Sequence, residues 1–362
     1  MTPAFHPLRV RERRPETADS VSLLFDVPES LRDAYRFRQG QFLTLRAPID
    51  GREERRSYSI CVGVDDYERR GELRVAVKRV AGGRFSNWVN DHLQPGQTID
   101  VMTPDGRFNT PLDPAQARHH VGFAGGSGIT PMLSLIKTTL EAEPRSRFTL
   151  IYGNRSLPAI MFLEDLEDLK NRYLGRLRLY HVLSDEPQEI ALFSGLLDRA
   201  RCEAFLADLL PPADIDEAFI CGPEPMMDAA EAALRAAGVP AGRIHVERFG
   251  VPMPAGQPKP VVVIGDEADA ADVTLVVDGK ARKLKVSRHG SGILDAGLAA
   301  GIDLPYACKG GVCCTCRARV LEGEVRMDKN YTLDEREMAQ GFVLTCQSHP
   351  VTDRVVISYD ER

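Results

Sequence analysis

Apolar and polar residues alternate in short runs along the first part of the chain, and turn residues separate the runs. Such alternation is typical of strands with one buried face, and closely spaced runs indicate antiparallel pairing. One short helix, near Phe85–His92, interrupts the runs. We therefore predict an antiparallel β-barrel domain over residues 1–112. Its expected strands are Val21–Phe25, Gln41–Leu45, Tyr58–Cys61, Leu73–Val80 and Thr98–Met102.

The pattern changes over residues 113–250, where apolar strands alternate with helical stretches such as Met132–Glu141 and Pro225–Ala236. Strand–helix alternation is typical of a parallel sheet covered by helices on both faces. We therefore predict an α/β parallel-sheet domain for this segment. Its expected strands are Val121–Ala124, Phe148–Tyr152, Leu177–Leu183 and Ala218–Cys221.

Residues 251–270 have the composition of a linker, because the run VPMPAGQPKP contains four prolines and precedes the acidic stretch GDEADAAD. Proline makes such a linker semi-rigid. At the usual domain size, 362 residues correspond to two or three domains. We predict three, with the last over residues 271–362, so the fold class is multidomain.

Composition adds limits on partners. A formal net charge of -6 argues against a nucleic-acid partner. No apolar run is long enough to span a bilayer, and the first residues lack the apolar core of a secretory signal. The eight cysteines suggest no disulfide framework, which fits a reducing compartment. We expect a cytoplasmic protein with no membrane partner.

Four cysteines near the C-terminus carry the clearest chemical signal. Cys308, Cys313 and Cys316 have the spacing C-x4-C-x2-C, and Cys346 follows after 29 residues. This is the spacing of plant-type [2Fe–2S] ferredoxins, in which a glycine-bearing loop aims three thiolates at the cluster. A chain with such a cluster handles single electrons.

A zinc site is the alternative for these cysteines, since Cys313 and Cys316 alone would fit a zinc knuckle. Structural zinc usually takes its ligands as two close pairs, whereas here three cysteines are clustered and the fourth stands apart. The asymmetry favours the iron–sulfur cluster. Cys314 lies in the same loop outside the ligand spacing and is interpreted as a bystander.

Two motifs in the predicted barrel suit a flavin dinucleotide. The R-S-Y-S motif offers an arginine fork for a pyrophosphate and a tyrosine that can stack on a flavin. The glycine turn before the short helix adds free backbone N–H groups at a helix start. Taken alone, R-S-Y-S would be an exposed strand edge more often than a site. The candidate FAD residues are Arg56, Ser57, Tyr58, Ser59, Gly82, Gly83 and Ser86.

Three turns in the predicted α/β domain lie where a parallel sheet binds nucleotides. The first, G-G-S-G-I-T-P, follows a strand and opens a helix but lacks the G-x-G-x-x-G fingerprint, so tight packing is an alternative reason for its glycines. The third has a cysteine that can contact a nicotinamide or simply be buried. The candidate residues are Gly125, Gly126, Ser127, Gly128, Thr130, Pro131, Asn154, Arg155, Ser156, Cys221, Gly222 and Pro223.

The second of these turns bears on the choice of nucleotide. No carboxylate follows the strand at the place where NAD-specific sites bind the ribose hydroxyls. Arg155 and Ser156 suit a 2′-phosphate instead. We therefore favour NADPH, with NADH as the alternative.

Taken together, the order of motifs resembles the ferredoxin–NADP reductase superfamily, in its form with a fused C-terminal ferredoxin. The resemblance covers nearly the whole chain. Within the superfamily, the turns Y-G-N-R-S and H-V-E-R-F and the run A-C-K-G-G-V-C-C-T-C resemble the reductase subunits of phenylacetyl-CoA epoxidases (ring 1,2-epoxidases). The resemblance implies FAD, a nicotinamide nucleotide and a β-grasp [2Fe–2S] ferredoxin domain.

The resemblance also implies roles for single residues. Arg56, Tyr58 and Ser59 would lie at the flavin, and Gly83 and Ser86 near its pyrophosphate. Gly126, Thr130 and Cys221 would face the nicotinamide nucleotide, and Glu247 and Phe249 would close the flavin site from the end of the reductase domain. The catalytic residues would be Tyr58, Ser59, Cys221 and Glu247.

The implied function is that of an electron-transfer reductase. It would take a hydride from NADPH and pass single electrons through FAD and the cluster to a di-iron oxygenase. A reductase of another aromatic oxygenase or of a fatty-acyl desaturase is one alternative. A non-enzymatic zinc-binding module is the other. Little acid–base chemistry is needed, so His119, His120 and His181 are interpreted as structural.

Overall fold

The computed structural model describes residues 4–249 and 269–361. Contacts divide the chain into two compact units, Phe5–Glu247 and Arg248–Arg362. The predicted linker at residues 251–270 lies almost wholly outside the described residues. Its last residue, Ala270, already belongs to the first strand of the second unit.

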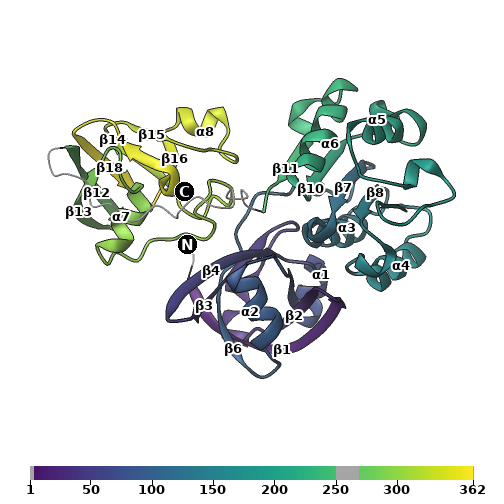
Figure 1. Ribbon diagram of the computed structural model, residues 1–362, viewed down its shortest axis with the longest axis horizontal. Coiled ribbons are helices and arrows are strands. Elements are labelled where there is room, and N and C mark those ends of the chain that lie inside the picture. The colour runs from purple at the N-terminus through teal and green to yellow at the C-terminus, as the bar shows by residue number, and fades with distance from the viewer. Residues whose placement is uncertain (1–3, 250–268, 362) are drawn as a thin grey trace. The chain divides into compact units, whose positions relative to one another are not determined.

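The first unit begins with a six-stranded antiparallel barrel in the order β4-β3-β6-β1-β2-β5 (Figure 1). A bridge between Ile60 and Val75 joins the outer strands β4 and β5 and closes the sheet. Apolar residues of alternating positions fill the interior. The strands are β1 Phe5–Thr17, β2 Ser20–Asp26, β3 Phe42–Ile49, β4 Arg52–Ser59, β5 Leu73–Lys78 and β6 Thr98–Met102, with helices α1 Val64–Arg70 and α2 Arg84–His92.

The barrel differs from the sequence prediction at two charged strands. β1 was not expected from the pattern, and β4 begins at Arg52 rather than at Tyr58. Both strands are rich in arginine and glutamate, which hide the alternation. Their backbones are nevertheless paired, β1 with β2 and β6 and β4 with β3. Backbone pairing with the neighbouring strands therefore determines the strand conformation of β1 and β4, despite their polar composition.

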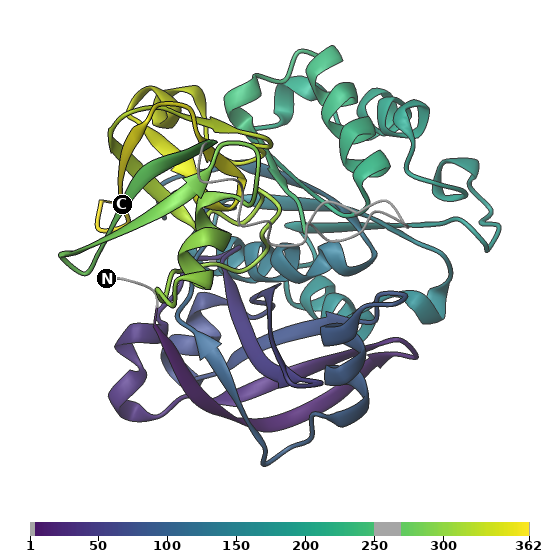
Figure 2. The same ribbon diagram turned by 60° about the vertical axis from the view of Figure 1, so that its left-hand side comes forward.

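The second part of this unit is a parallel five-stranded sheet in the order β11-β10-β7-β8-β9. β7 lies between β10 and β8, so the strand order reverses there. Figure 2 shows the sheet between two layers of helices. The strands are β7 His119–Gly125, β8 Arg147–Asn154, β9 Leu177–Leu183, β10 Glu217–Cys221 and β11 Ile244–Glu247, and the helices are α3 Ile129–Ala142, α4 Leu163–Arg172, α5 Arg199–Asp208 and α6 Glu224–Ala236.

Separate apolar clusters cover the two faces of this sheet. One is formed with α5 and α6, and the other with α3 and α4. Cys61, Ala76 and Phe108 from the barrel segment join the α3 cluster. The barrel and the α/β part therefore share buried surface, which fixes their relation within this unit.

The second unit is a mixed five-stranded sheet in the order β13-β12-β18-β14-β16 with one helix packed against it. β12 and β18 run parallel, and the other pairs are antiparallel. This is the expected β-grasp arrangement. The elements are β12 Ala270–Val277, β13 Lys280–Ser287, α7 Ile293–Ala299, β14 Arg317–Glu322, β15 Val325–Met327, α8 Glu335–Ala339, β16 Phe342–Leu344, β17 Ser348–Pro350 and β18 Arg354–Ser358.

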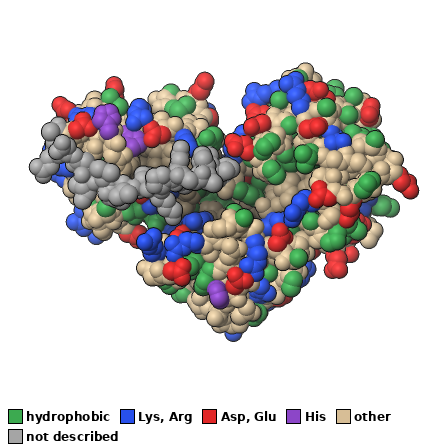
Figure 3. Space-filling view, viewed as in Figure 1, with side chains coloured by type: hydrophobic (Ala, Val, Ile, Leu, Met, Phe, Trp, Pro, Cys, Tyr) green, Lys and Arg blue, Asp and Glu red, His purple; other side chains and the backbone are tan. Residues whose placement is uncertain are grey.

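Surface charge is mixed on the face shown in Figure 3, where Lys and Arg side chains are interspersed with Asp and Glu. Among the described residues, no helix is long and apolar enough to cross a membrane.

Candidate functional site

The R-S-Y-S motif forms the end of β4. Arg56 is half exposed, and its guanidinium lies 3.2 Å from a carboxylate oxygen of Glu54. Arg84, at the start of α2, lies 3.8 Å from the other oxygen of the same carboxylate. Arg84 also pairs with the Asp50 carboxylate at 2.9 Å, so two guanidinium groups and two carboxylates gather here. Such a pair of cations can also hold a pyrophosphate.

Tyr58 lies half-buried beside this pair, with its ring centre 6.0 Å from that of Phe85. Burial raises the pKa of the Tyr58 hydroxyl, so the group stays protonated and can donate a hydrogen bond. Ser59 is buried. A role for these two residues in the wall of a flavin site stays a prediction.

The glycine turn before α2 is closely packed. Gly82 has a φ of +70°, and a Cβ at Gly83 would lie 2.7 Å from the Ser86 hydroxyl oxygen. That oxygen accepts a hydrogen bond from the Val80 N–H at 3.1 Å. No side chain caps the start of α2. The first N–H groups of the helix can therefore take an anionic ligand.

The loop after β7 lies at the point where the strand order of the parallel sheet reverses. Gly126 has a φ of +50°, and its carbonyl accepts a hydrogen bond from the Tyr152 hydroxyl at 2.8 Å. Thr130 closes the turn by donating to the Ser127 carbonyl at 3.0 Å. Pro131 follows in the first turn of α3. The loop leaves a helix start at the edge where such sheets bind nucleotides.

The loop after β10 lies directly against the first one. A Cβ at Gly125 would lie 2.6 Å from Pro223, and a Cβ at Gly222 would lie 2.8 Å from the Gly125 nitrogen. Cys221 pairs in register with Glu247 of β11 and is fully buried. Burial, reinforced by the Glu247 charge, raises the pKa of its thiol. The thiol is therefore neutral.

The sequence suggested Cys221 from its place at a strand end and Glu247 only through a resemblance, and the structure brings the two to adjacent strands. Phe249 is half exposed, just after β11. A contact of these residues with a nicotinamide or a flavin stays a prediction.

The folded chain brings carboxylates from other segments close to the turn after β8. Arg155 is 71% exposed and lies 3.9 Å from the carboxylate of Asp19, in the barrel turn between β1 and β2. Glu186, after β9, accepts a hydrogen bond from the Leu157 N–H at 3.0 Å. The sequence shows no carboxylate next to β8, but distant segments supply two. Asn154 and Ser156 flank Arg155 as expected.

The four candidate metal ligands come together in the second unit. The thiols pair as Cys308 with Cys313 and Cys316 with Cys346, and charge interactions link the two pairs. The Cys313 thiol and nearby backbone N–H groups donate to the Cys308 sulfur and lower its pKa. The Gly310 N–H lies 3.3 Å from that sulfur. Such donors favour thiolates and fit the sulfurs of an iron–sulfur cluster.

The cluster loop takes left-handed backbone conformations at Lys309, Gly311 and Cys314, with φ between 51° and 79°. Cys314 donates from its thiol to the Thr332 hydroxyl at 2.9 Å. Within residues 4–249 and 269–361, no three His, Cys, Asp or Glu side chains are grouped as single-metal ligands.

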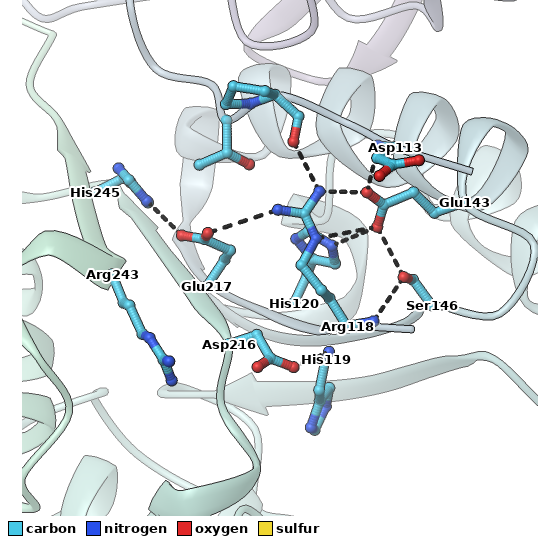
Figure 4. Close-up of polar contacts among 12 residues, drawn as sticks. Asp113, Arg118, His119, His120, Glu143, Ser146, Asp216, Glu217, Arg243 and His245 are labelled. Carbon is cyan, nitrogen blue, oxygen red and sulfur yellow. Dashed lines mark hydrogen bonds and ion pairs between the residues drawn. The ribbon is translucent and has the colours of Figure 1, made fainter. Parts of the chain in front are cut away.

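A network of buried charges was missed by sequence reasoning (Figure 4). The carboxylate of Glu143 accepts hydrogen bonds from Arg118, Ser146 and the Asp113 N–H, and it contacts His120 at 3.1 Å. Burial alone would raise its pKa, but these donors lower it to about 2. The network lies at the amino-terminal end of β7, away from the nucleotide loops, and fixes the segment that joins barrel and sheet.

Comparison with known proteins agrees with this geometry. Three family models match: an oxidoreductase FAD-binding domain at residues 7–110, an oxidoreductase NAD-binding domain at 123–232, and a 2Fe-2S iron-sulfur cluster binding domain at 275–351. A 1,2-phenylacetyl-CoA epoxidase subunit of Escherichia coli is 46% identical over 358 residues, covering 99% of this chain and 98% of the relative. The chain belongs to the ferredoxin–NADP reductase superfamily, in its form with a fused [2Fe–2S] ferredoxin.

A second relative lies in the same superfamily. The ferredoxin reductase component of 3-ketosteroid-9-alpha-monooxygenase from Rhodococcus rhodochrous is 38% identical and covers 95% of this chain and 94% of its own length. Among solved structures, phthalate dioxygenase reductase matches with a TM-score of 0.61 at 23% identity over 98% of both chains, which shows a shared fold.

The protein is therefore an NAD(P)H-dependent flavin and iron–sulfur oxidoreductase with FAD-binding, NAD-binding and [2Fe–2S] domains. The zinc-module alternative is wrong, because the cysteine loop matches a [2Fe–2S] domain.

Proposed function

We propose that this chain is the reductase component that supplies electrons from NADPH to a di-iron oxygenase of the phenylacetyl-CoA epoxidase type. The main support for this proposal is the 46% identity to a phenylacetyl-CoA epoxidase component over nearly the whole chain. The two thiol pairs among the four candidate cluster ligands agree with it.

In the flavin site, Arg56 and Arg84 would bind the pyrophosphate in place of the Glu54 and Asp50 carboxylates that they now contact. Tyr58, kept neutral by burial, packs on the flavin and donates a hydrogen bond from its hydroxyl. Gly83 lets the α2 start approach the ligand. The remaining members of the proposed site are Ser57, Ser59, Gly82 and Ser86.

In the nucleotide site, the two glycine loops provide backbone N–H groups and close approach for the nucleotide phosphates. Cys221 faces the nicotinamide end, and Glu247, beside it on β11, closes the flavin site, with Phe249 two residues further along the chain. Arg155 and Ser156 bind the 2′-phosphate of NADPH. The proposed loop residues are Gly125, Gly126, Ser127, Gly128, Thr130, Pro131, Asn154, Gly222 and Pro223.

In the cluster site, the thiol pairs Cys308–Cys313 and Cys316–Cys346 would hold the two irons. The backbone N–H groups around Cys308 stabilise negative charge on sulfur. When bound, the flavin accepts two electrons from the nucleotide and the cluster carries them one at a time. The protein supplies orientation and potential rather than acid–base catalysis.

The test is NADPH consumption by the cluster-loaded protein mixed with phenylacetyl-CoA oxygenase components, with and without phenylacetyl-CoA. Consumption and product formation that depend on phenylacetyl-CoA would support the proposal. NADPH oxidation with artificial acceptors but no response to phenylacetyl-CoA would contradict it. The steroid-oxygenase relative favours a second candidate, a reductase for a different multicomponent oxygenase.

A further inference from the structure

An ion pair joins the barrel to the turn proposed to bind the nucleotide's 2′-phosphate. Asp19, in the turn between β1 and β2, places a carboxylate oxygen 3.9 Å from a guanidinium nitrogen of Arg155, just after β8. The two residues are 136 positions apart in the sequence. They belong to different sheets of the same compact unit.

The carboxylate is held more firmly than the guanidinium. Asp19 accepts a hydrogen bond from the Thr17 hydroxyl at 2.7 Å and lies 3.6 Å from the Lys78 ammonium. Its own carbonyl accepts from the Arg79 N–H at 2.8 Å. Arg155 is 71% exposed, whereas Asp19 is 36% exposed. A ligand can therefore draw Arg155 away, but Asp19 stays in place.

The backbone of the turn is fixed as well. The Asp185 N–H donates to the Arg155 carbonyl at 2.8 Å, and Glu186 occupies the Leu157 N–H. A nucleotide phosphate at this turn thus meets the exposed Arg155 guanidinium together with two carboxylates, Asp19, which also pairs with Lys78, and Glu186. The nearby carboxylates therefore make this turn less favourable for a doubly charged 2′-phosphate than Arg155 and Ser156 alone would suggest.

We propose that Asp19 is a specificity-determining residue that weakens binding of the 2′-phosphate by pairing with Arg155. The inference rests on the proposed nucleotide site. Asp19 competes with the 2′-phosphate for the Arg155 guanidinium. This competition lowers the affinity for NADPH but not for NADH, so the two affinities become more similar. Because both groups are partly exposed, the effect is modest and sensitive to salt.

The test compares binding of 2′,5′-ADP and 5′-ADP to the FAD- and cluster-containing protein by isothermal titration calorimetry. Asp19→Asn should tighten 2′,5′-ADP about three- to fivefold, as expected for an exposed pair, and leave 5′-ADP unchanged. The gain should shrink in about 0.5 M salt. An unchanged or weaker 2′,5′-ADP affinity would overturn the proposal.

Asp26→Asn is the matched control. Asp26 lies at the other end of β2, about 20 Å away along the strand; it is 31% exposed and pairs with Arg9 at 2.6 Å. The Asp26→Asn variant removes one negative charge from the same barrel but far from Arg155. It should therefore leave the affinities for 2′,5′-ADP and 5′-ADP unchanged. An equal gain in this control would reduce the effect to net charge and overturn the role of Asp19.

The Arg155→Ala background tests the pairing itself. There, Asp19→Asn should change 2′,5′-ADP affinity by less than half of its effect in the parent protein. A full effect would mean that Asp19 acts on the phosphate directly, which contradicts the proposed competition. If 5′-ADP fails to bind the parent protein, the nucleotide site itself is wrong, a result distinct from failure of this inference.

Discussion

Gly128 lies so close to the end of β10 that a Cβ on it would stand 2.0 Å from the carbonyl oxygen of Cys221. The same Cβ would lie 2.9 Å from the Gly222 nitrogen. Backbone atoms on the neighbouring strand cannot move aside as a side chain can. The two loops that are proposed to hold the nucleotide therefore fit together only if this position lacks a side chain.

Gly128→Ala should destabilise the protein by about 3 kcal/mol or more, because the loops must separate. It should also weaken 5′-ADP binding. Urea unfolding and calorimetric titration measure the two effects. Gly242→Ala is the control, since a Cβ there meets nothing within 4 Å; its stability should change by less than about 1 kcal/mol. Normal stability and binding in Gly128→Ala would refute the close approach.

Cys313→Ser should abolish the iron–sulfur signal and electron delivery to an oxygenase, while NADPH-driven reduction of ferricyanide through the flavin stays largely intact. The loss follows from removing one of two thiols that form a pair. Absorption and electron paramagnetic resonance spectra report the cluster.

Cys314→Ser is the matched control for that change, because the Cys314 thiol donates to the Thr332 hydroxyl and is not in either pair. The variant should keep the cluster. Loss of the cluster in Cys314→Ser, or equal loss of both activities in Cys313→Ser, would contradict the ligand assignment.

Much of the fold could be predicted because its strands carry clear patterns. The runs at Thr98–Met102 and Leu177–Leu183 coincide with β6 and β9. The pattern failed at β1 and the first half of β4, where runs of arginine and glutamate, Arg11–Arg14 and Arg52–Arg55, interrupt the alternation of apolar and polar residues. Their strand conformation comes from partners distant in sequence. The exact domain boundaries stay a prediction.

The [2Fe–2S] domain could be predicted because three of its cysteines are close in sequence, and the role of the two glycine loops stays a prediction. What the sequence could not show are contacts between distant segments. Asp19 of the barrel lies 3.9 Å from Arg155 of the α/β part, and Glu143 accepts hydrogen bonds from Asp113 and Arg118, which lie in an earlier segment of the chain. Charge composition alone gives no sign of either arrangement.

His119 should make stability depend on pH. It is buried and its side chain contacts the Thr149 hydroxyl at 2.8 Å. Burial, with the nearby Arg147 and Arg178 charges, lowers its pKa to about 4. The unfolded chain, with an ordinary histidine pKa of about 6.5, binds the proton more tightly, so stability falls as pH drops from about 6.5 toward 4.

Replacing this residue, as His119→Asn, should flatten the pH dependence by about 2 kcal/mol between pH 7 and pH 5. Urea titrations at each pH measure the free energy of unfolding. The range stays above the usual carboxylate pKa, so Glu143, with its pKa lowered to about 2, does not contribute. Parallel curves for the parent and the variant would show that His119 is not a buried neutral group.

Arg56→Ala should weaken FAD binding about tenfold or more, the amount expected for a charge-assisted hydrogen bond to a phosphate. Fluorescence titration of the FAD-free protein measures the affinity. Arg52→Ala removes an exposed arginine from the start of the same strand and should leave affinity unchanged. Equal effects in the two variants would reduce the role of Arg56 to general charge.

The central claim is that electrons pass from nucleotide to flavin to cluster within this one chain. Its most direct test is anaerobic addition of NADPH, with electron paramagnetic resonance detection of the reduced cluster, in the FAD-containing and the FAD-free protein. We predict a reduced-cluster signal only when FAD is present, whereas dithionite gives the signal in both. A signal from NADPH without FAD, or none with it, would contradict the claim.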